Sequence, residues 1–356
     1  MTINYGGNLQ MSWFIFTLIC MLGWGFADLF YKKSNVDGDR YSHLKTAVWV
    51  GLMMGLFSIL FIVLTLLKEP LTGLVGEQIA DAVTAETLLN GETSIFSSAV
   101  KYLPASLSYI ISMVIGYAGM RYLEVSIVSP VQNASGALSA IVMFFFFFFT
   151  GRIGGFFETF SPLEIIGTCF IVIGVIALAV VEQRLAKKEG ALDLKPEERK
   201  YRFGALALLF PILYCVFDTI GTAADGIILD EEAGLGLGEI DVLILYGLTF
   251  LLAGICCWIF LLIREKKAYN PFRGAEIKTR GAAALFEQFG QIFYVYAMAN
   301  NPIIAAPMVA SYCIVSALLS RIFLKEKLKT SQYACVITVI AGIVMLGIAE
   351  GLAGGE

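Results

Sequence analysis

The chain has 356 residues, of which 58% are hydrophobic and only 15% are charged, with a mean hydropathy of +0.78. Soluble domains carry about one quarter charged residues, so this balance excludes an ordinary soluble protein and predicts an integral membrane protein. The formal net charge is -4. A single histidine, His43, excludes a site built from several histidines, and the seven cysteines lie in apolar runs without a CxxC pair, so neither a metal nor another cofactor is predicted.

The apolar runs predict an all-α protein with ten membrane-spanning helices. Each run is close to the ~20 residues that a helix needs to cross a bilayer, and none alternates as the strands of a barrel do. Residues 1–10 carry no Lys or Arg, so we expect no cleavable signal peptide and a retained first span. The predicted spans are residues 11–31, 46–67, 104–122, 126–149, 162–181, 203–224, 241–263, 282–299, 303–324 and 331–350.

The basic residues collect in alternate loops. All 25 Lys and Arg residues except Lys68, Lys101 and Arg152 fall in the odd-numbered loops between the predicted spans. Basic loops remain in the cytoplasm, so we expect both termini on the outer side of the cell membrane. The sixth loop is acidic instead and is expected outside; the residues assigned to it are Asp225, Asp230, Glu231, Glu232, Glu239 and Asp241.

A pattern in the first half of the chain returns in the second. Residues 117–140 and 294–317 are both apolar stretches interrupted by polar residues, and a polar position near the start of each half matches as well. The aligned pairs are Tyr117 with Tyr294, Pro130 with Pro307, and Asp28 with Asp218.

This repetition predicts two five-helix halves that form one membrane domain. We expect a first repeat over residues 1–181, a charged cytoplasmic linker over 182–202 and a second repeat over 203–356. Because five is odd, the second repeat enters the membrane from the opposite side. Inverted repeats of this kind are found in many secondary transporters.

Three segments carry a resemblance to a known family: Trp24-Gly25, residues 117–140, and residues 297–346, which contain the short loop Lys325-Glu326-Lys327-Leu328 before the last span. Together they are similar to the EamA-type ten-helix branch of the drug/metabolite transporter superfamily, over nearly the whole chain. The resemblance implies two five-helix repeats and a transport function. The first half departs from the family pattern, since TGRIGGFFETFS (150–161) stands where a Glu-containing loop is expected. Many bacterial members are expected to have their termini inside, whereas the loop charges here predict the outside.

Three carboxylates interrupt the apolar spans: Asp28, Asp218 and Glu287. A charged side chain at the centre of a membrane helix costs about 2.5–3.5 kcal/mol on insertion scales, so such residues point to function. We expect all three to couple transport to protons or to gate the path, and Glu287 to contact the substrate as well. The structural alternative is a buried hydrogen bond or ion pair that holds helices together.

Amide and aromatic side chains are the other predicted substrate ligands. Glu287, Gln291 and Tyr294 fall on one helix face. Trp24, matched by Tyr214 in the second half, could stack on a solute. For each residue the alternative is helix packing or interhelical hydrogen bonding, worth about 0.6 kcal/mol. Besides Glu287, the predicted ligands are Trp24, Gln132, Asn133, Gln288, Gln291, Tyr294 and Tyr312.

Small residues and prolines mark places where helices are expected to meet. A stripe of small or polar residues on the fourth span is echoed on the ninth, and such stripes favour close packing. The GxxxG from Gly51 to Gly55 indicates a helix contact within the chain or a homodimer. Pro130 and Pro307 either break their helices near the site or lie in a first helical turn, where proline removes no intrahelical hydrogen bond. The stripes are Ser129, Gln132, Gly136 and Ser139, and then Ser311, Tyr312, Ser316 and Ser320.

These features predict a secondary transporter that moves a small polar metabolite or drug by alternating access, with proton coupling as a further hypothesis. The absence of a nucleotide-binding motif argues against ATP hydrolysis. The rival predictions are a polytopic membrane enzyme acting on lipid-linked substrates, which the sequence disfavours because it lacks a His, Asp or Cys cluster, and a non-transporting sensor or scaffold. The expected partners are a small-molecule substrate and the lipid bilayer, without nucleic acid, and a homodimer is left open.

Overall fold

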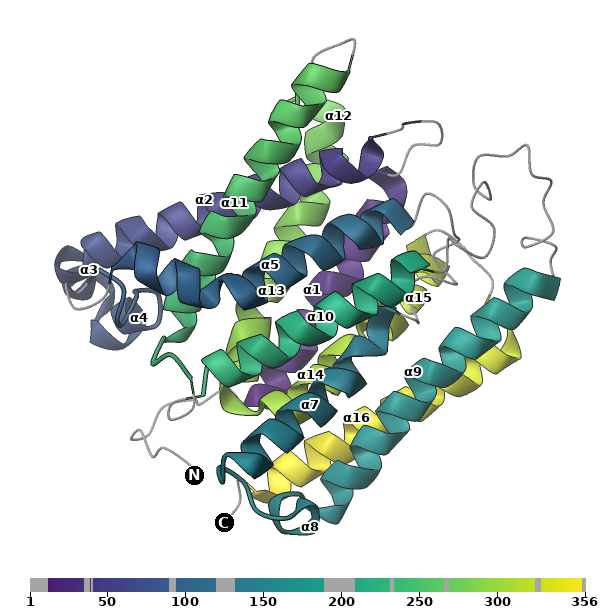
Figure 1. Cartoon of the computed structure of the whole chain (residues 1–356). Coiled ribbons are helices and arrows are strands. Elements are labelled where there is room, and N and C mark those ends of the chain that lie inside the picture. The colour runs from purple at the N-terminus through teal and green to yellow at the C-terminus, as the bar shows by residue number, and fades with distance from the viewer. Residues whose placement is uncertain are drawn as a thin grey trace.

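The structure, a computed structural model, describes residues 12–34, 39, 41–89, 94–119, 132–188, 209–230, 234–265, 269–323 and 328–353. Across these ranges the chain folds into helices and forms no β-strand (Figure 1). The helices are α1 Trp13–Ser34, α2 Ser42–Leu66, α3 Lys68–Val75, α4 Glu77–Asp81, α5 Ile95–Gly119, α7 Ser135–Phe149, α8 Phe156–Thr159, α9 Pro162–Lys188, α10 Leu209–Ile228, α11 Glu239–Arg264, α12 Gly274–Glu276, the π-helix η3 Ile277–Gly281, α13 Ala282–Asn300, α14 Pro302–Ala310, α15 Tyr312–Phe323 and α16 Thr330–Ala353.

Seven helices of the described chain are long and apolar enough to cross a membrane: α1, α2, α5, α10, α11, the pair α14–α15, and α16. Two further apolar helices, α7 and the stretch Pro162–Leu178 of α9, are shorter. The prediction of an all-α, multi-pass membrane protein is thereby confirmed. The predicted span 282–299 corresponds to α13, which is not among the seven and which carries several polar residues, Glu287, Gln288 and Gln291 among them.

Some predicted boundaries differ from the structure. The third span was expected to begin at residue 104, but α5 begins at Ile95 and contains Pro104. The ninth span is divided into α14 and α15 at Ser311, one turn after Pro307. Pro307 lies inside α14, and the hydrogen bond that it cannot donate is the one to the carbonyl four residues earlier, so it does not account for the division at Ser311. Ser129, Pro130 and the rest of residues 120–131 lie outside the described residues.

The helices pack in pairs that join distant parts of the sequence. The largest pairings are α2 with α11, α9 with α16, α1 with α13, α5 with α10 and α7 with α14. Figure 1 shows α9 and α16 lying side by side along one edge of the bundle. At the α2–α11 crossing, a Cβ on Gly51 would lie 2.4 Å from the carbonyl oxygen of Phe250 and 2.8 Å from the Cα of Gly254. The GxxxG therefore serves a contact within the chain, and whether the protein dimerises stays a prediction.

One end of the bundle, here called the α8 end, carries α3, α4 and α8, the beginning of α1 and the end of α16 (Figure 1). The Trp13 indole donates a hydrogen bond to Glu350 Oε2 at 2.6 Å, which fixes the beginning of α1 to the end of α16. Arg152 and Asp230 form a two-point ion pair with the distances 3.1 Å and 2.9 Å, and so connect the segment before α8 with the end of α10. The opposite end of the bundle carries α12 and is here called the α12 end (Figure 1).

The prediction that six acidic residues lie together in the sixth loop is partly wrong. Asp241 belongs to the first turn of α11, is 0% exposed and accepts hydrogen bonds from Thr87, Leu88 and Gly238. Asp225 lies inside α10 and is also 0% exposed. Both carboxylates are part of the folded interior because the helices extend further than the apolar runs suggest.

Candidate functional site

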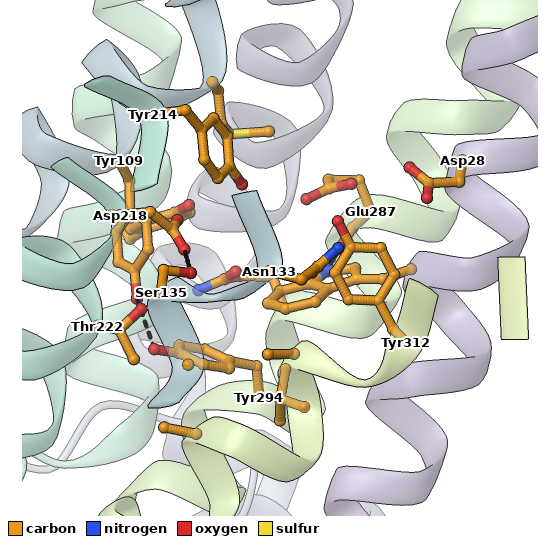
Figure 2. Close-up of a pocket in the computed structure, with 18 residues that line it drawn as sticks. Asp28, Tyr109, Asn133, Ser135, Tyr214, Asp218, Thr222, Glu287, Tyr294 and Tyr312 are labelled. Atoms are coloured by element: carbon orange, nitrogen blue, oxygen red, sulfur yellow. Dashed lines mark hydrogen bonds between the residues drawn. The ribbon is translucent and has the colours of Figure 1, made fainter. Parts of the chain in front are cut away.

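A cavity of about 80 Å³ lies inside the bundle, where helices from both halves of the sequence meet. A volume of this size has room for several water molecules. Figure 2 shows how its polar and aromatic side chains converge. Its lining consists of Trp24, Asp28, Tyr109, Met113, Asn133, Ser135, Gly136, Tyr214, Asp218, Thr222, Tyr246, Glu287, Gln291, Tyr294, Ala306, Val309, Ala310 and Tyr312.

All three predicted carboxylates line this cavity. Asp28 accepts a hydrogen bond from Ser316 at 2.7 Å, and Asp218 accepts one from Ser135 at 2.6 Å. The two contacts are alike, since each joins an aspartate of one half to a serine of the other. In the view of Figure 2, Glu287 lies between Asp28 and Asp218. Three acidic groups around so small a space make the cavity strongly electronegative whenever they are ionised.

The aromatic wall is built around Trp24, whose position depends on glycine. Its ring lies beside Tyr294 and Tyr312, with centroid distances of 5.3 Å and 5.6 Å. The indole nitrogen donates to the carbonyl oxygen of Glu287 at 3.2 Å. A Cβ on Gly290 would come within 2.4 Å of the Trp24 ring, so only glycine leaves room for the indole there. Aromatic faces of this kind can hold an apolar or a cationic part of a ligand.

Of the predicted amide ligands, the structure brings two to the cavity and leaves two outside its lining. Gln291 and Asn133 line it. Gln291 is 2% exposed, and its amide nitrogen has no hydrogen-bond partner among the described residues. Gln288 is similarly buried but is absent from the lining, and on α13 it is turned by about 100° from the lining residue Glu287. Gln132 is also absent from the lining, and its amide nitrogen lies against Gly116 of α5.

The stripe of small residues on the fourth span serves close helix packing beside the cavity. A Cβ on Gly136 would come 2.4 Å from the Cβ of Ala310 and 2.7 Å from the carbonyl oxygen of Ala306. Ser139 and Ser311 bond to carbonyl oxygens of their own helices. Ser316 is the exception, because its hydroxyl reaches Asp28.

Several lining residues were not among the predicted ligands. Tyr109, Thr222 and Tyr246 contribute hydroxyl groups or ring faces, and the Tyr109 hydroxyl is bonded to Tyr294 and to Thr222. Tyrosine and threonine are common in membrane helices, so their presence in the sequence gave no signal. For Thr222 alone the sequence offered a clue, because it falls on the same helical face as Asp218, four residues earlier. The structure also buries Asp225 beyond this cluster, without placing it in the lining.

The chemistry of the lining is suited to binding a polar solute. Among the described residues no group of three or more His, Cys, Asp or Glu side chains could hold an ion. The lining offers carboxylate acceptors, an amide donor without a partner and several ring faces, and it contains no Lys, Arg or His. Such a set can bind a polar solute through hydrogen bonds and charge.

The comparisons with known proteins agree with the membrane fold. Residues 233–348 match the EamA-like transporter family. No curated protein matches the chain. A solved structure described only as "Crystal structure of protein" aligns with 95% of this chain and 96% of its own chain, with a TM-score of 0.59 and 12% sequence identity. At that identity the likeness shows the fold alone. Residues 233–348 are thus similar to the EamA-like transporter family, which is part of the drug/metabolite transporter superfamily.

Proposed function

We propose that the protein is a secondary transporter that moves a small polar metabolite or drug across the cell membrane by alternating access between two five-helix halves. The observation that carries the proposal is the polar cavity inside the bundle, lined by carboxylates, amides and aromatic rings from both halves. The family likeness of residues 233–348 favours a membrane transporter of the same superfamily.

The helix packing supports two inverted repeats, residues 1–181 and 203–356, joined by the linker 182–202. In this proposal α7, α9 and α13 complete the seven long apolar helices to ten spans. α1 packs against α13 and α15, and its counterpart α10 packs against the counterparts of those helices, α5 and α7. The paired contacts of Asp28 with Ser316 and of Asp218 with Ser135 follow the same relation. Two halves that rock about a shared site are the usual basis of alternating access.

The chemistry of the lining favours a solute that carries hydrogen-bonding groups and no strong negative charge. Glu287 and Asp218 repel anions such as phosphate esters when they are ionised, and no basic side chain in the lining offsets them. The unpaired amide nitrogen of Gln291 fits a hydroxyl or carbonyl oxygen of the solute. Asp28, Asp218 and Glu287 are also the groups that we propose for proton coupling or gating.

The test has two steps, a screen for ligands and a measurement of transport. A metabolite panel is screened for compounds that raise the thermal stability of the purified protein, and uptake of a stabilising compound is then measured in proteoliposomes. We expect Gln291→Ala to raise the half-saturation concentration about tenfold, because about 1.4 kcal/mol of lost hydrogen bonding corresponds to one decade. We expect Glu287→Gln to reduce uptake and remove its pH dependence.

Gln288→Ala is the matched control, since Gln288 is equally buried on the same helix but lies outside the cavity lining. It should leave the half-saturation concentration unchanged. Equal effects of the two glutamine variants, or unchanged transport and pH dependence in Glu287→Gln, would contradict the site assignment. Saturable stabilisation without flux would favour a sensor or scaffold, and chemical conversion of the compound would favour a membrane enzyme.

A further inference from the structure

A fourth acidic residue of the bundle interior, Asp225, lies in α10 two turns beyond Asp218. Its side chain is 0% exposed, as is that of Tyr102 on α5. The Tyr102 hydroxyl donates a hydrogen bond to Asp225 Oδ1 at 2.7 Å. The second oxygen, Oδ2, is buried without a hydrogen-bond partner among the described residues.

The surroundings of Asp225 contain no counter-charge among the described residues. The titratable groups that face it are Tyr102 and Tyr109 from α5, Tyr246 from α11, Tyr294 from α13, and Asp218 from α10 itself. Towards α7, α13 and α14, the neighbouring Gly226 is enclosed by Met143, Met298 and Pro302. A carboxyl group buried in such surroundings loses its hydration, and the Tyr102 hydroxyl replaces it at only one of the two oxygens.

A cluster of hydroxyl groups lies next to Asp225 and lines the cavity. The Tyr109 hydroxyl is bonded to Thr222 Oγ1 at 3.1 Å and to the Tyr294 hydroxyl (Figure 2). All three residues line the cavity, and Thr222 lies between Asp218 and Asp225 on the same face of α10. Because a hydroxyl group both donates and accepts, this cluster can pass a proton between the cavity and the Asp225 side.

We propose that Asp225 is a proton-binding site, with Tyr102 as its hydrogen-bond donor, and that the Tyr109–Thr222–Tyr294 hydroxyl cluster connects it to the cavity. The bound proton is on Oδ2, while Oδ1 accepts the Tyr102 hydroxyl. On release, the O–H bond of the carboxyl group breaks, Asp225 becomes an anion, and the proton moves through the cluster to the cavity. The use of this proton in coupling rests on the proposed transport function, whereas proton binding by Asp225 does not.

The experiment measures the proton directly by infrared difference spectroscopy on the full-length protein in lipid vesicles, as the pH is raised from neutral to alkaline. A protonated carboxyl group gives a carbonyl stretching band that its anion lacks. We expect such a band, absent in Asp225→Asn. In Tyr102→Phe the band should move to higher frequency, because the hydrogen bond to the carbonyl oxygen is lost.

Asp218→Asn and Glu287→Gln identify the bands of the cavity carboxyls and should leave the Asp225 band in place. A spectrum unchanged in both Asp225→Asn and Tyr102→Phe would mean that Asp225 releases no proton between neutral and alkaline pH, and would overturn the proposal. If Asp225→Asn does not fold, the conservative Tyr102→Phe variant decides alone, since an unshifted band then refutes the assignment. These measurements need no substrate, so a protein without transport activity would still show the band.

Discussion

Gly136 sets how closely α7 and α14 approach each other beside the cavity. A side chain there would meet the backbone carbonyl of Ala306 at 2.7 Å, and a backbone atom cannot move aside as a flexible side chain can. We expect Gly136→Ala to destabilise the protein by about 1–3 kcal/mol, the usual cost of overpacking a tight interior. The measurement is the thermal unfolding temperature in lipid nanodiscs.

The control for this prediction is Gly73→Ala in α3, where a Cβ would have no atom within 4 Å. Alanine is the better helix former, so this variant should melt no lower than the parent protein. Equal melting temperatures for the parent and Gly136→Ala would mean that α7 and α14 lie further apart than the structure places them.

At the level of single residues, the sequence predicted which side chains were costly to bury, but not which way every one of them points. Asp28 and Glu287 stood out because carboxylates are rare in apolar spans, and both line the cavity. Gln288 and Gln291 were both predicted ligands, yet only Gln291, which the helical period placed on one face with Glu287 and Tyr294, lines it. The rotation of α13 depends on its contact with α1, where Gly290 makes room for Trp24. A contact of this kind is not encoded in the periodicity of one helix.

Among the elements, the segment 82–89 is anchored to α11 by one carboxylate. Asp241 accepts from the Thr87 amide and hydroxyl at 3.0 Å and 2.6 Å, from the Leu88 amide at 3.0 Å and from the Gly238 amide at 3.0 Å. In Asp241→Asn an amide group replaces one acceptor oxygen and leaves buried donors unpaired. We expect a loss of about 1–3 kcal/mol in unfolding free energy and faster proteolysis within residues 68–94.

Asp81→Asn provides the comparison, because its ion pair with Lys68 is about half exposed, with side-chain exposures of 52% and 44%. Exposed pairs contribute about 0–1 kcal/mol, so neither the melting temperature nor the cleavage rate should change much. If the two variants behaved alike, Asp241 would not be the anchor of this segment.

The elements themselves were largely predictable, because long apolar runs leave the backbone few options other than helix. Their ends were not. Asp225 and Asp241 were assigned to an outer loop since charge usually marks the end of a span, but α10 continues to Ile228 and α11 begins at Glu239. Both carboxylates are retained in the interior by hydrogen-bond donors on other elements, Tyr102 for Asp225 and the Thr87–Leu88 segment for Asp241. Partners so distant in sequence are not visible before folding.

For the molecule as a whole, Arg280 ties the two parts of the sequence together at the α12 end. It is 2% exposed and donates to Glu276 at 2.6 Å, to the carbonyl oxygen of Ser34 at 2.8 Å and to the Ser42 hydroxyl at 2.9 Å. These bonds join η3 to the end of α1 and the beginning of α2. We expect Arg280→Met to cost about 1–3 kcal/mol of unfolding free energy, since it leaves buried acceptors unpaired.

Lys278→Ala is the control, because Lys278 is exposed in the same π-helix. A change within about 0.5 kcal/mol is usual for such a surface position. Both variants are compared by thermal unfolding in nanodiscs. A parent-like melting temperature for Arg280→Met would show that the packing of α2 on α11 holds this end together without the arginine.

The orientation in the membrane is the last prediction, and it concerns the whole chain. Described basic residues such as Arg264, Arg273 and Lys278 lie near the α12 end, so the positive-inside rule predicts this end in the cytoplasm and the α8 end, with both chain termini, outside. Gly73 and Gly274 are suited to a test, because each is exposed and a side chain at either meets no atom within 4 Å. In intact cells a membrane-impermeant maleimide should label Gly73→Cys and spare Gly274→Cys, while permeabilised cells should show both. The parent protein reports the background of its seven cysteines, and the reverse labelling pattern would place the termini inside.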